Sequence, residues 1–435
     1  MRAHVLLVPS LALLAGCPVG SDPEPTVTWT DVAPLVEAHC AECHREGGVG
    51  PFRADTYEDA SAWAGAMASA VADRSMPPFL VKDDGSCGTY EDGHWLSDDE
   101  IDLFATWAAE GAAEGEGATV TPPEPATLSG TAVDTTTPDF LPEIVGGQNA
   151  EFDEYRCFPA EIPGGVSGFL TGYEVLPGNP AIVHHVLGYA VKLDGESDQA
   201  GKTNAERMAE LEAQDPDRDG WPCFTEAGNG VAVDFEVVAW APGQGPVEYP
   251  DGVGLAIPEG SVMVYQVHYN LADPATVGQR DQTTVRLRIE EEVDRQAYMT
   301  LPDGFLGGLT DLGSLPPGEE EVTISFDLPI NWLTGGLPIE LELLGVMPHM
   351  HERGREMRVR LRHPDDAQTC VAEVEAWSFE WQRLYMYETP IQVSSNDVLE
   401  VECTYSTLGD TEPTTPGWGT QNEMCLPGLL AAVAE

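Results

Sequence analysis

The sequence is poor in basic residues. Lys and Arg number 20 against 74 Asp and Glu, so the 435-residue chain carries a formal net charge of −54. Such a surface repels phosphate backbones, so we expect no nucleic-acid partner. The length predicts about three domains, and a hydrophobic content of 42% is enough for packed cores.

Long apolar runs are also missing, apart from the N-terminus. Residues 1–17 combine a basic Arg2 with a short apolar run that ends in LAGC at 14–17. This run is too short to span a bilayer and is typical of a signal peptide. Its end is similar to a bacterial lipobox, which implies that Cys17 carries lipid; the alternative is an ordinary signal peptide with a spare cysteine. We expect an exported protein in the periplasm or at the surface of a Gram-negative-type bacterium, an outer-membrane lipoprotein that meets the membrane only through this anchor.

Two composition shifts divide the rest of the chain. Residues 18–27 form a tether, and residues 116–137 form a Gly/Pro/Thr-rich linker without periodicity. Between them, residues 28–115 place apolar residues at helical spacing and carry a capping box at Ser97. Beyond the linker, alternating runs such as VMVYQVHY at 262–269 predict strands separated by Gly and Pro turns. The fold is therefore predicted to be mainly β, preceded by a small all-α domain.

The helical segment contains CAECH at residues 40–44. In a c-type haem site, Cys40 and Cys43 would form thioethers to the haem and His44 would be an axial ligand. A zinc ribbon would need a second Cys or His pair nearby, and a redox dithiol would follow a strand. Met76, in RSMPPF, is the predicted sixth ligand; the alternative is a buried loop methionine. The segment is similar to small class I cytochrome c domains, which implies covalent haem c in residues 28–115.

Histidines gather in three short motifs of the β region: His184-His185, His268 in YQVHY, and His349 with His351 in HMH. Side chains two apart in a strand share a face, so His349 and His351 can chelate one ion. Adjacent His184 and His185 point apart, so they can share a metal only across a bulge or through different ring nitrogens. For any single histidine the alternative is a hydrogen-bonded core residue.

The order of these motifs, followed by EMC at 423–425, resembles the copper type II, ascorbate-dependent monooxygenases over roughly residues 138–435. The resemblance implies two jelly-roll-like β-sandwich copper domains, at residues 138–293 and 294–435. It also implies two copper ions, ascorbate as a possible donor, and a reaction that hydroxylates a small organic substrate with O2. The implied ligands of the electron-transferring copper are His184, His185 and His268; those of the copper that meets O2 and substrate, the catalytic set, are His349, His351 and Met424.

The cysteines agree with this resemblance. It implies a disulfide between Cys403 and Cys425, beside Met424, and Cys157 with Cys223 is the expected second pair. Cys87 has no obvious role and is expected to be a reduced thiol. Cys370 is left over and expected to be buried.

Three smaller stretches qualify the picture. Asp215–Glu226 fits the calcium-loop string D-x-D-x-D-G-x5-E, but two prolines lie inside it, so calcium and a capped acidic turn both stay open. His363, beside a Pro-Asp-Asp turn, is predicted to be an ordinary surface residue. Met347 and Gly428 replace the Arg and Tyr that hold a peptide carboxylate in peptide-amidating members, so we do not expect a C-terminal glycine substrate.

Together these features predict an exported copper monooxygenase with its own haem domain. The haem would pass single electrons to the first copper, replacing or supplementing ascorbate, with a periplasmic donor behind it. The linker would keep the haem domain at a high effective concentration. The alternative from another class is a non-catalytic copper-binding electron-transfer lipoprotein. A surface adhesion or scaffold protein on a β-sandwich frame is a third hypothesis.

Overall fold

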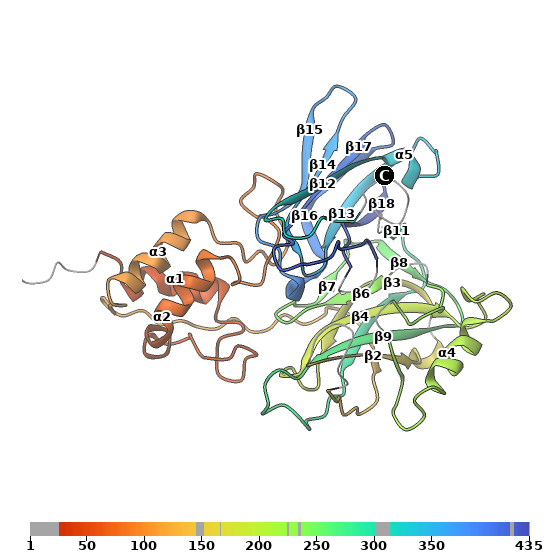
Figure 1. The fold of residues 1–435 in the computed structure, drawn as a ribbon, viewed down its shortest axis with the longest axis horizontal. Coiled ribbons are helices and arrows are strands. Elements are labelled where there is room, and N and C mark those ends of the chain that lie inside the picture. The colour runs from red at the N-terminus through yellow and green to blue at the C-terminus, as the bar shows by residue number, and fades with distance from the viewer. Residues whose placement is uncertain are drawn as a thin grey trace, which may run out of the picture.

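A computed structural model of the chain describes residues 26–144, 152–165, 167–223, 226–233, 236–300, 314–417 and 422–434. The predicted signal peptide, Cys17 and nearly all of the predicted tether lie outside these residues. Three helices form a unit beside a much larger β region (Figure 1). Within the described ranges, none of the helices has the length and apolar character that a bilayer crossing requires.

The helical unit agrees with the sequence prediction. Its helices are α1 (Trp29–His39), α2 (Tyr57–Ala72) and α3 (Asp98–Ala109). The predicted capping box is present, because Ser97 Oγ accepts from the backbone N–H of Glu100 and the Glu100 carboxylate accepts from the N–H of Ser97. Phe104 and Trp107, at helical spacing on α3, are fully buried between the helices. CAECH begins where α1 ends.

The described part of the β region contains three sheets. The nine-stranded sheet has the order β1-β10-β3-β8-β11-β18-β13-β16, with β7 beside β3. Its strands are β1 (Val133–Thr136), β3 (Gly168–Leu176), β7 (Val247–Glu248), β8 (Val253–Ile257), β10 (Thr284–Glu290), β11 (Arg295–Thr300), β13 (Glu340–His349), β16 (Tyr385–Ser394) and β18 (Leu426–Val433).

The two smaller sheets cover this one. The five-stranded sheet, in the order β5-β2-β9-β4-β6, consists of β2 (Asp153–Ala160), β4 (Val183–Lys192), β5 (Trp221–Pro222), β6 (Glu236–Trp240) and β9 (Ser261–Asn270). The four-stranded sheet, in the order β12-β17-β14-β15, consists of β12 (Val322–Pro329), β14 (Gly354–Arg362), β15 (Gln368–Val374) and β17 (Val398–Tyr405). Short helices α4 (Asn204–Glu212) and α5 (Ile330–Leu333) and 3₁₀ turns η1 (Pro163–Gly165) and η2 (Phe379–Trp381) complete the elements.

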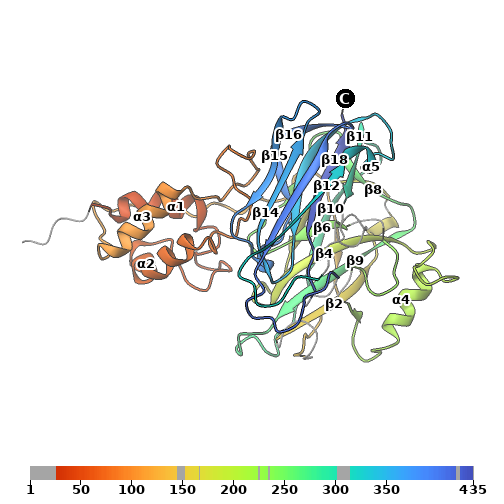
Figure 2. The same cartoon turned by 45° about the horizontal axis from the view of Figure 1, so that its top comes forward.

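The sheets form two sandwiches that share the nine-stranded sheet (Figures 1 and 2). In the first sandwich, the first core joins the five-stranded sheet to β3, β8 and β10. In the second sandwich, the second core joins the four-stranded sheet to β13, β16 and β18. β11 begins at Arg295, next to the predicted domain boundary, but it pairs in parallel with β8 of the first sandwich. Leu344 and Leu430 of the second sandwich also lie in the first core. The two predicted β-sandwich domains therefore share one continuous nine-stranded sheet.

The predicted linker is more ordered than its composition indicates. The indole N–H of Trp29 donates to the carbonyl of Ala118 at 2.9 Å, and Ser129 Oγ donates to Glu248 at 2.6 Å. Its last residues form β1, which pairs with β10 at the edge of the sheet. A strand therefore lies inside the predicted linker, where a four-residue edge strand is too short to show clear alternation in the sequence.

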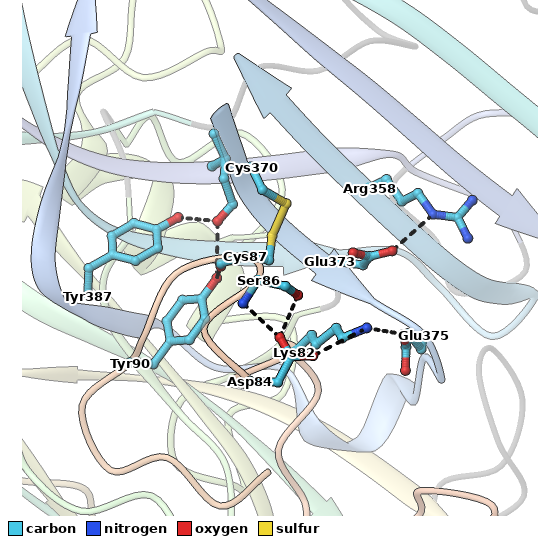
Figure 3. Close-up of a disulfide and its surroundings, with 11 residues drawn as sticks. Lys82, Asp84, Ser86, Cys87, Tyr90, Arg358, Cys370, Glu373, Glu375 and Tyr387 are labelled. Atoms are coloured by element: carbon cyan, nitrogen blue, oxygen red, sulfur yellow. Dashed lines mark hydrogen bonds and ion pairs between the residues drawn. A yellow bond between two sulfur atoms is a disulfide. The ribbon is translucent and has the colours of Figure 1, made fainter. Parts of the chain in front are cut away.

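A second connection joins the helical unit to the second sandwich. Residues 79–91, between α2 and α3, form an arm that reaches β15 and β16 (Figure 3). Phe79, Leu80, Val81 and Tyr90 are buried in the core of that sandwich. Val81 and Tyr90 make antiparallel bridges to Val374 and Tyr387, respectively.

A disulfide between Cys87 and Cys370 closes the arm (Figure 3). The expectation that Cys87 is reduced and Cys370 unpaired is therefore wrong. Beside the disulfide, the Tyr90 and Tyr387 hydroxyls both donate to the carbonyl of Val371, at 3.0 and 2.6 Å. The two cysteines are 283 positions apart and belong to different predicted domains, so no local spacing pairs them. Only the even count left after CAECH and Cys17 hinted at a third disulfide.

Because the disulfide of the arm is a covalent connection, we expect the helical unit to stay attached to the β region after its linker is cut. A protease site introduced at the exposed residues 123–127 should release no fragment on a non-reducing denaturing gel and two fragments after reduction. The cut Cys87→Ser/Cys370→Ser variant should separate into the same two fragments on the denaturing gel without reductant. Cys157→Ser/Cys223→Ser is the matched control, because both of its cysteines lie on one side of the cut. Separation of the cut wild type without reductant would contradict the disulfide.

Candidate metal centres and the cavity at CAECH

β4 and β9 bring three histidines together. His184 and His185 lie at the start of β4, and His268 lies near the end of the antiparallel β9. The register of these two strands shifts between Val183 and His185. This irregularity breaks the alternation of side chains, so both adjacent histidines can face His268. A bulge is one of the two ways, named from the sequence, in which these neighbours could share a metal, and the register shift shows that this way is used.

The three imidazoles converge through the same ring nitrogen. His268 Nδ1 lies 3.2 Å from Nδ1 of His184 and 3.4 Å from Nδ1 of His185. One ligand nitrogen from each of the three lies within 4.8 Å of the other two. Imidazole nitrogens gathered in this way can hold a copper ion in either oxidation state.

Residues behind the triad orient His268. Its Nε2 lies 3.3 Å from Asp153 Oδ1, and the amide of Asn270 donates to the same oxygen at 2.8 Å. Burial alone would raise the pKa of Asp153, but the contacts with His268 and Asn270 lower it, so the group is a carboxylate. A carboxylate on one ring nitrogen leaves the lone pair on the other, Nδ1, for a metal. The ring of Tyr155 stacks on His268, with centroids 4.1 Å apart.

The second histidine pair lies where β13 ends beside the start of β18. His349 is the last residue of β13 and pairs with Leu426, so the antiparallel ladder brings HMH next to EMC. The rings of His349 and His351 have centroids 5.1 Å apart. Desolvation, together with repulsion from His351, lowers the pKa of His349 to about 3. The imidazole is therefore neutral, as a metal ligand must be.

The EMC segment holds His351 in one orientation. His351 Nδ1 donates to the carbonyl of Asn422 at 3.0 Å, so its Nε2 carries the lone pair. The buried Glu423 carboxylate accepts from the backbone N–H groups of His351 and Arg353, at 2.9 and 2.7 Å. Burial raises the pKa of Glu423 to about 7. Glu423 was not among the predicted site residues, although it stands beside Met424 in the motif.

Met424 itself is buried, and its backbone is tied from two sides. The hydroxyl of Tyr405 donates to the Met424 carbonyl at 2.8 Å. The next residue, Cys425, forms the predicted disulfide with Cys403. The predicted pair Cys157–Cys223 is also present.

Comparison with known proteins supports these centres. The model of the N-terminal domain of copper type II ascorbate-dependent monooxygenases matches residues 147–275, which contain the triad. The C-terminal domain model matches residues 305–429, which contain HMH and EMC. The chain belongs to this family of oxidoreductases. The helical unit lies outside both matches.

Curated relatives share a modest identity. DBH-like monooxygenase protein 1 of Gallus gallus is 29% identical over 45% of this chain and 32% of its own length. Tyramine beta-hydroxylase of Caenorhabditis briggsae is 26% identical, covering 58% and 40%. Dopamine beta-hydroxylase of Homo sapiens is 26% identical, covering 62% and 42%. The chain therefore spans well under half the length of these relatives.

The family assignment does not cover CAECH, which borders a cavity of about 480 Å³. All four predicted haem residues line it: Cys40, Cys43, His44 and Met76. The two cysteines are free thiols, and burial raises their pKa values to about 12 and about 11. Met67 lines the cavity as well. This second sulfur, which lies on α2, was not among the predicted haem ligands.

The surroundings of His44 fit a haem ligand. Its Nδ1 donates to the carbonyl of Phe52 at 3.0 Å, which leaves the lone pair on Nε2. Gly50 packs against the ring so closely that a Cβ there would lie 2.6 Å from Nδ1. Two free thiols and an oriented imidazole on one cavity wall are the groups that covalent haem attachment needs.

The calcium-like loop encloses an arginine. The buried Arg156 guanidinium donates to the Asp215 carboxylate at 2.7 Å and to the carbonyls of Arg218, Asp219 and Gly220 at 2.8–3.0 Å. Gly220 has φ +66°, and a Cβ there would lie 2.1 Å from the carbonyl oxygen of Cys157. The loop therefore satisfies its oxygens with a protein cation, which favours the acidic turn over calcium.

Removing the Arg156 guanidinium should lower the free energy of unfolding. Arg156→Met should destabilise the fold by about 3–5 kcal/mol, because Asp215 and three carbonyls would lose their buried partner. The measurement is the midpoint of denaturant unfolding. Arg280→Met removes an exposed pair with Asp139 and should have a much smaller effect. A calcium titration of the wild type should leave its midpoint unchanged; a calcium-dependent increase would contradict this assignment.

His363 also differs from expectation. His363 bridges Asp397 and Thr369, with Nδ1 3.0 Å from the carboxylate and Nε2 2.8 Å from the hydroxyl. It is a half-buried structural link between two turns and not an ordinary surface residue. Met347 is buried in the first core.

Proposed function

We propose that the protein is an exported copper monooxygenase that hydroxylates a small organic substrate with O2. The observation that carries this is the presence of two separate histidine centres in the two matched domains. His184, His185 and His268 would hold the electron-transferring copper. His349, His351 and Met424 would hold the copper that meets O2 and substrate.

The two centres differ in a way that suits these roles. The first has only imidazole ligands, which tolerate both oxidation states, whereas a thioether at the second favours Cu(I), the state that binds O2. The chain prepares the second centre by keeping His349 neutral and by fixing His351 through Asn422 and Glu423. Copper bound there would supply the activation of O2.

We further propose that CAECH carries covalent haem c, with His44 and Met76 as axial ligands. A haem held there would supply single electrons, from ascorbate or a periplasmic donor. Three disulfides fit an oxidising compartment. Export as a lipoprotein anchored through Cys17 is part of the same proposal.

The choice of Met76 over Met67 can be tested in the holoprotein. Methionine ligation raises the reduction potential of a haem, so Met76→Ala should lower the midpoint potential. Met67→Ala removes a sulfur from the same cavity and should leave the potential close to that of the wild type. Spectroelectrochemical titration measures both. The reverse pattern would assign the sixth position to Met67.

Oxygen labelling tests the reaction. Holoprotein reduced under argon is mixed with ¹⁸O2 and a panel of small organic compounds. The panel contains dopamine and tyramine, which the names of the relatives suggest, and uncharged aromatic compounds. Mass spectrometry should find one labelled oxygen in a hydroxylated product. If both centres hold copper and no compound across the panel gains label, the non-catalytic electron-transfer hypothesis is favoured.

A further inference from the structure

The cavity at CAECH is built by both parts of the molecule. One wall belongs to the helical unit and contains the cysteines, His44 and the two methionines. The opposite wall belongs to the β region and consists of residues 180–184 with Pro242, Asn270 and Trp381. The two walls are in close contact, because a Cβ at Gly243 would lie 3.4 Å from Cys43 Sγ.

One residue belongs to this wall and to the first copper triad. His184 lines the cavity, whereas His185 and His268 are not among the described residues that line it. Yet His184 Nδ1 lies only 3.2 Å from His268 Nδ1 within the triad. The cavity at CAECH and the histidine triad are therefore adjacent, with His184 at their common boundary.

The arm holds the two walls together. Met76, Pro77 and Pro78 line the cavity, and the arm starts at the next residue, Phe79. The guanidinium of Arg383 lies over the rings of Phe79 and Tyr385, 5.5 and 5.2 Å from their centroids. With Cys87–Cys370 further along the arm, the helical wall cannot move away from the β wall without extracting buried side chains.

We propose that CAECH and the first sandwich together form a two-domain haem site, in which His184 is both a cavity wall and a copper ligand. This rests on the proposed covalent haem. A haem held by Cys40, Cys43 and His44 would supply single electrons to a copper ion held by the triad, with ascorbate as the reductant that supplies them. The fixed contact, and not a flexible tether, brings the centres together.

The test uses the full-length protein with haem attached and copper removed. It compares variants at two predicted ligands of the same copper ion, His184 and His185. His184→Ala should lower the midpoint potential of the haem, because water entering through the missing wall stabilises the more positive ferric state. His185→Ala should leave the potential unchanged. Both variants should lose copper from the first centre, as measured by electron paramagnetic resonance after copper is added back. His184→Phe refills the wall without a ligand and should return the potential towards the wild-type value while copper stays absent.

Equal haem potentials in the two alanine variants would overturn the shared wall. That outcome is distinct from failure of the proposed function. If the wild type holds no covalent haem, the haem assignment fails before any potential is measured. If haem is attached and the potentials differ but no ¹⁸O is incorporated, the shared wall stands and the monooxygenase proposal fails.

Discussion

Met424→Ile should lower ¹⁸O incorporation by more than about a hundredfold, since even outer-shell changes at metal sites cost 10–100-fold. Met424 is almost fully buried, and isoleucine fills a similar volume without a thioether. The change therefore removes a ligand and leaves the packing nearly intact. X-ray absorption of the reduced wild type should show a sulfur scatterer on copper that disappears in the variant.

The first copper centre is the internal reference for this experiment. Its imidazoles lie on β4 and β9, in the other sandwich, so its paramagnetic resonance signal should persist in Met424→Ile. Met357→Ile is the matched control, because Met357 is buried in the core of the second sandwich, on a strand where isoleucine is well tolerated. It should keep both the sulfur scatterer and the product. A sulfur signal that survives in Met424→Ile would remove this residue from the copper site.

Cys40→Ala/Cys43→Ala should abolish covalent haem completely. Both thiols line the cavity, and together they are the attachment points that C-x-x-C-H provides. Wild-type protein from a host with cytochrome c maturation should keep its haem through a denaturing gel stained for haem. The double variant should show none, while the two copper centres remain loaded.

The matched control for this prediction also lacks two cysteines. Cys87→Ser/Cys370→Ser removes the disulfide of the arm, whose two cysteines are not among the described residues that line the cavity, and should keep covalent haem. If acid-acetone extracts the haem of the wild type, its attachment is not covalent, and the reading of CAECH fails. Loss of haem in both double variants would instead indicate that the arm is needed for haem insertion.

Short-range patterns were sufficient for much of this protein. The helix that starts at Asp98 follows from Ser97, Glu100 and the apolar spacing of Phe104 and Trp107, all within one segment. The candidate ligands were also visible as residue types, because HH, YQVHY, HMH, EMC and CAECH each carry their chemistry within five positions. The family relationship depends on the order of these same motifs.

What the sequence could not determine is how distant segments meet. Adjacent His184 and His185 share a site because the register slips between β4 and β9, and a register exists only once both strands are paired. Arg156 fills the calcium-like loop from a strand some sixty residues earlier in the chain. Cys87 finds Cys370 across 283 positions, which loop-closure entropy opposes until the arm is already packed.

The sequence by itself determined which groups are available: two thiols and an imidazole in CAECH, five histidines and a methionine in the motifs of the β region, and strands to carry them. Only the tertiary structure decided that the two sandwiches share one sheet and that the helical unit is clamped to them. It also decided that His184 bounds the cavity of CAECH. The physical reason is that covalent neighbours set local conformation and chemistry, whereas burial of apolar surface between remote segments sets which sites become neighbours.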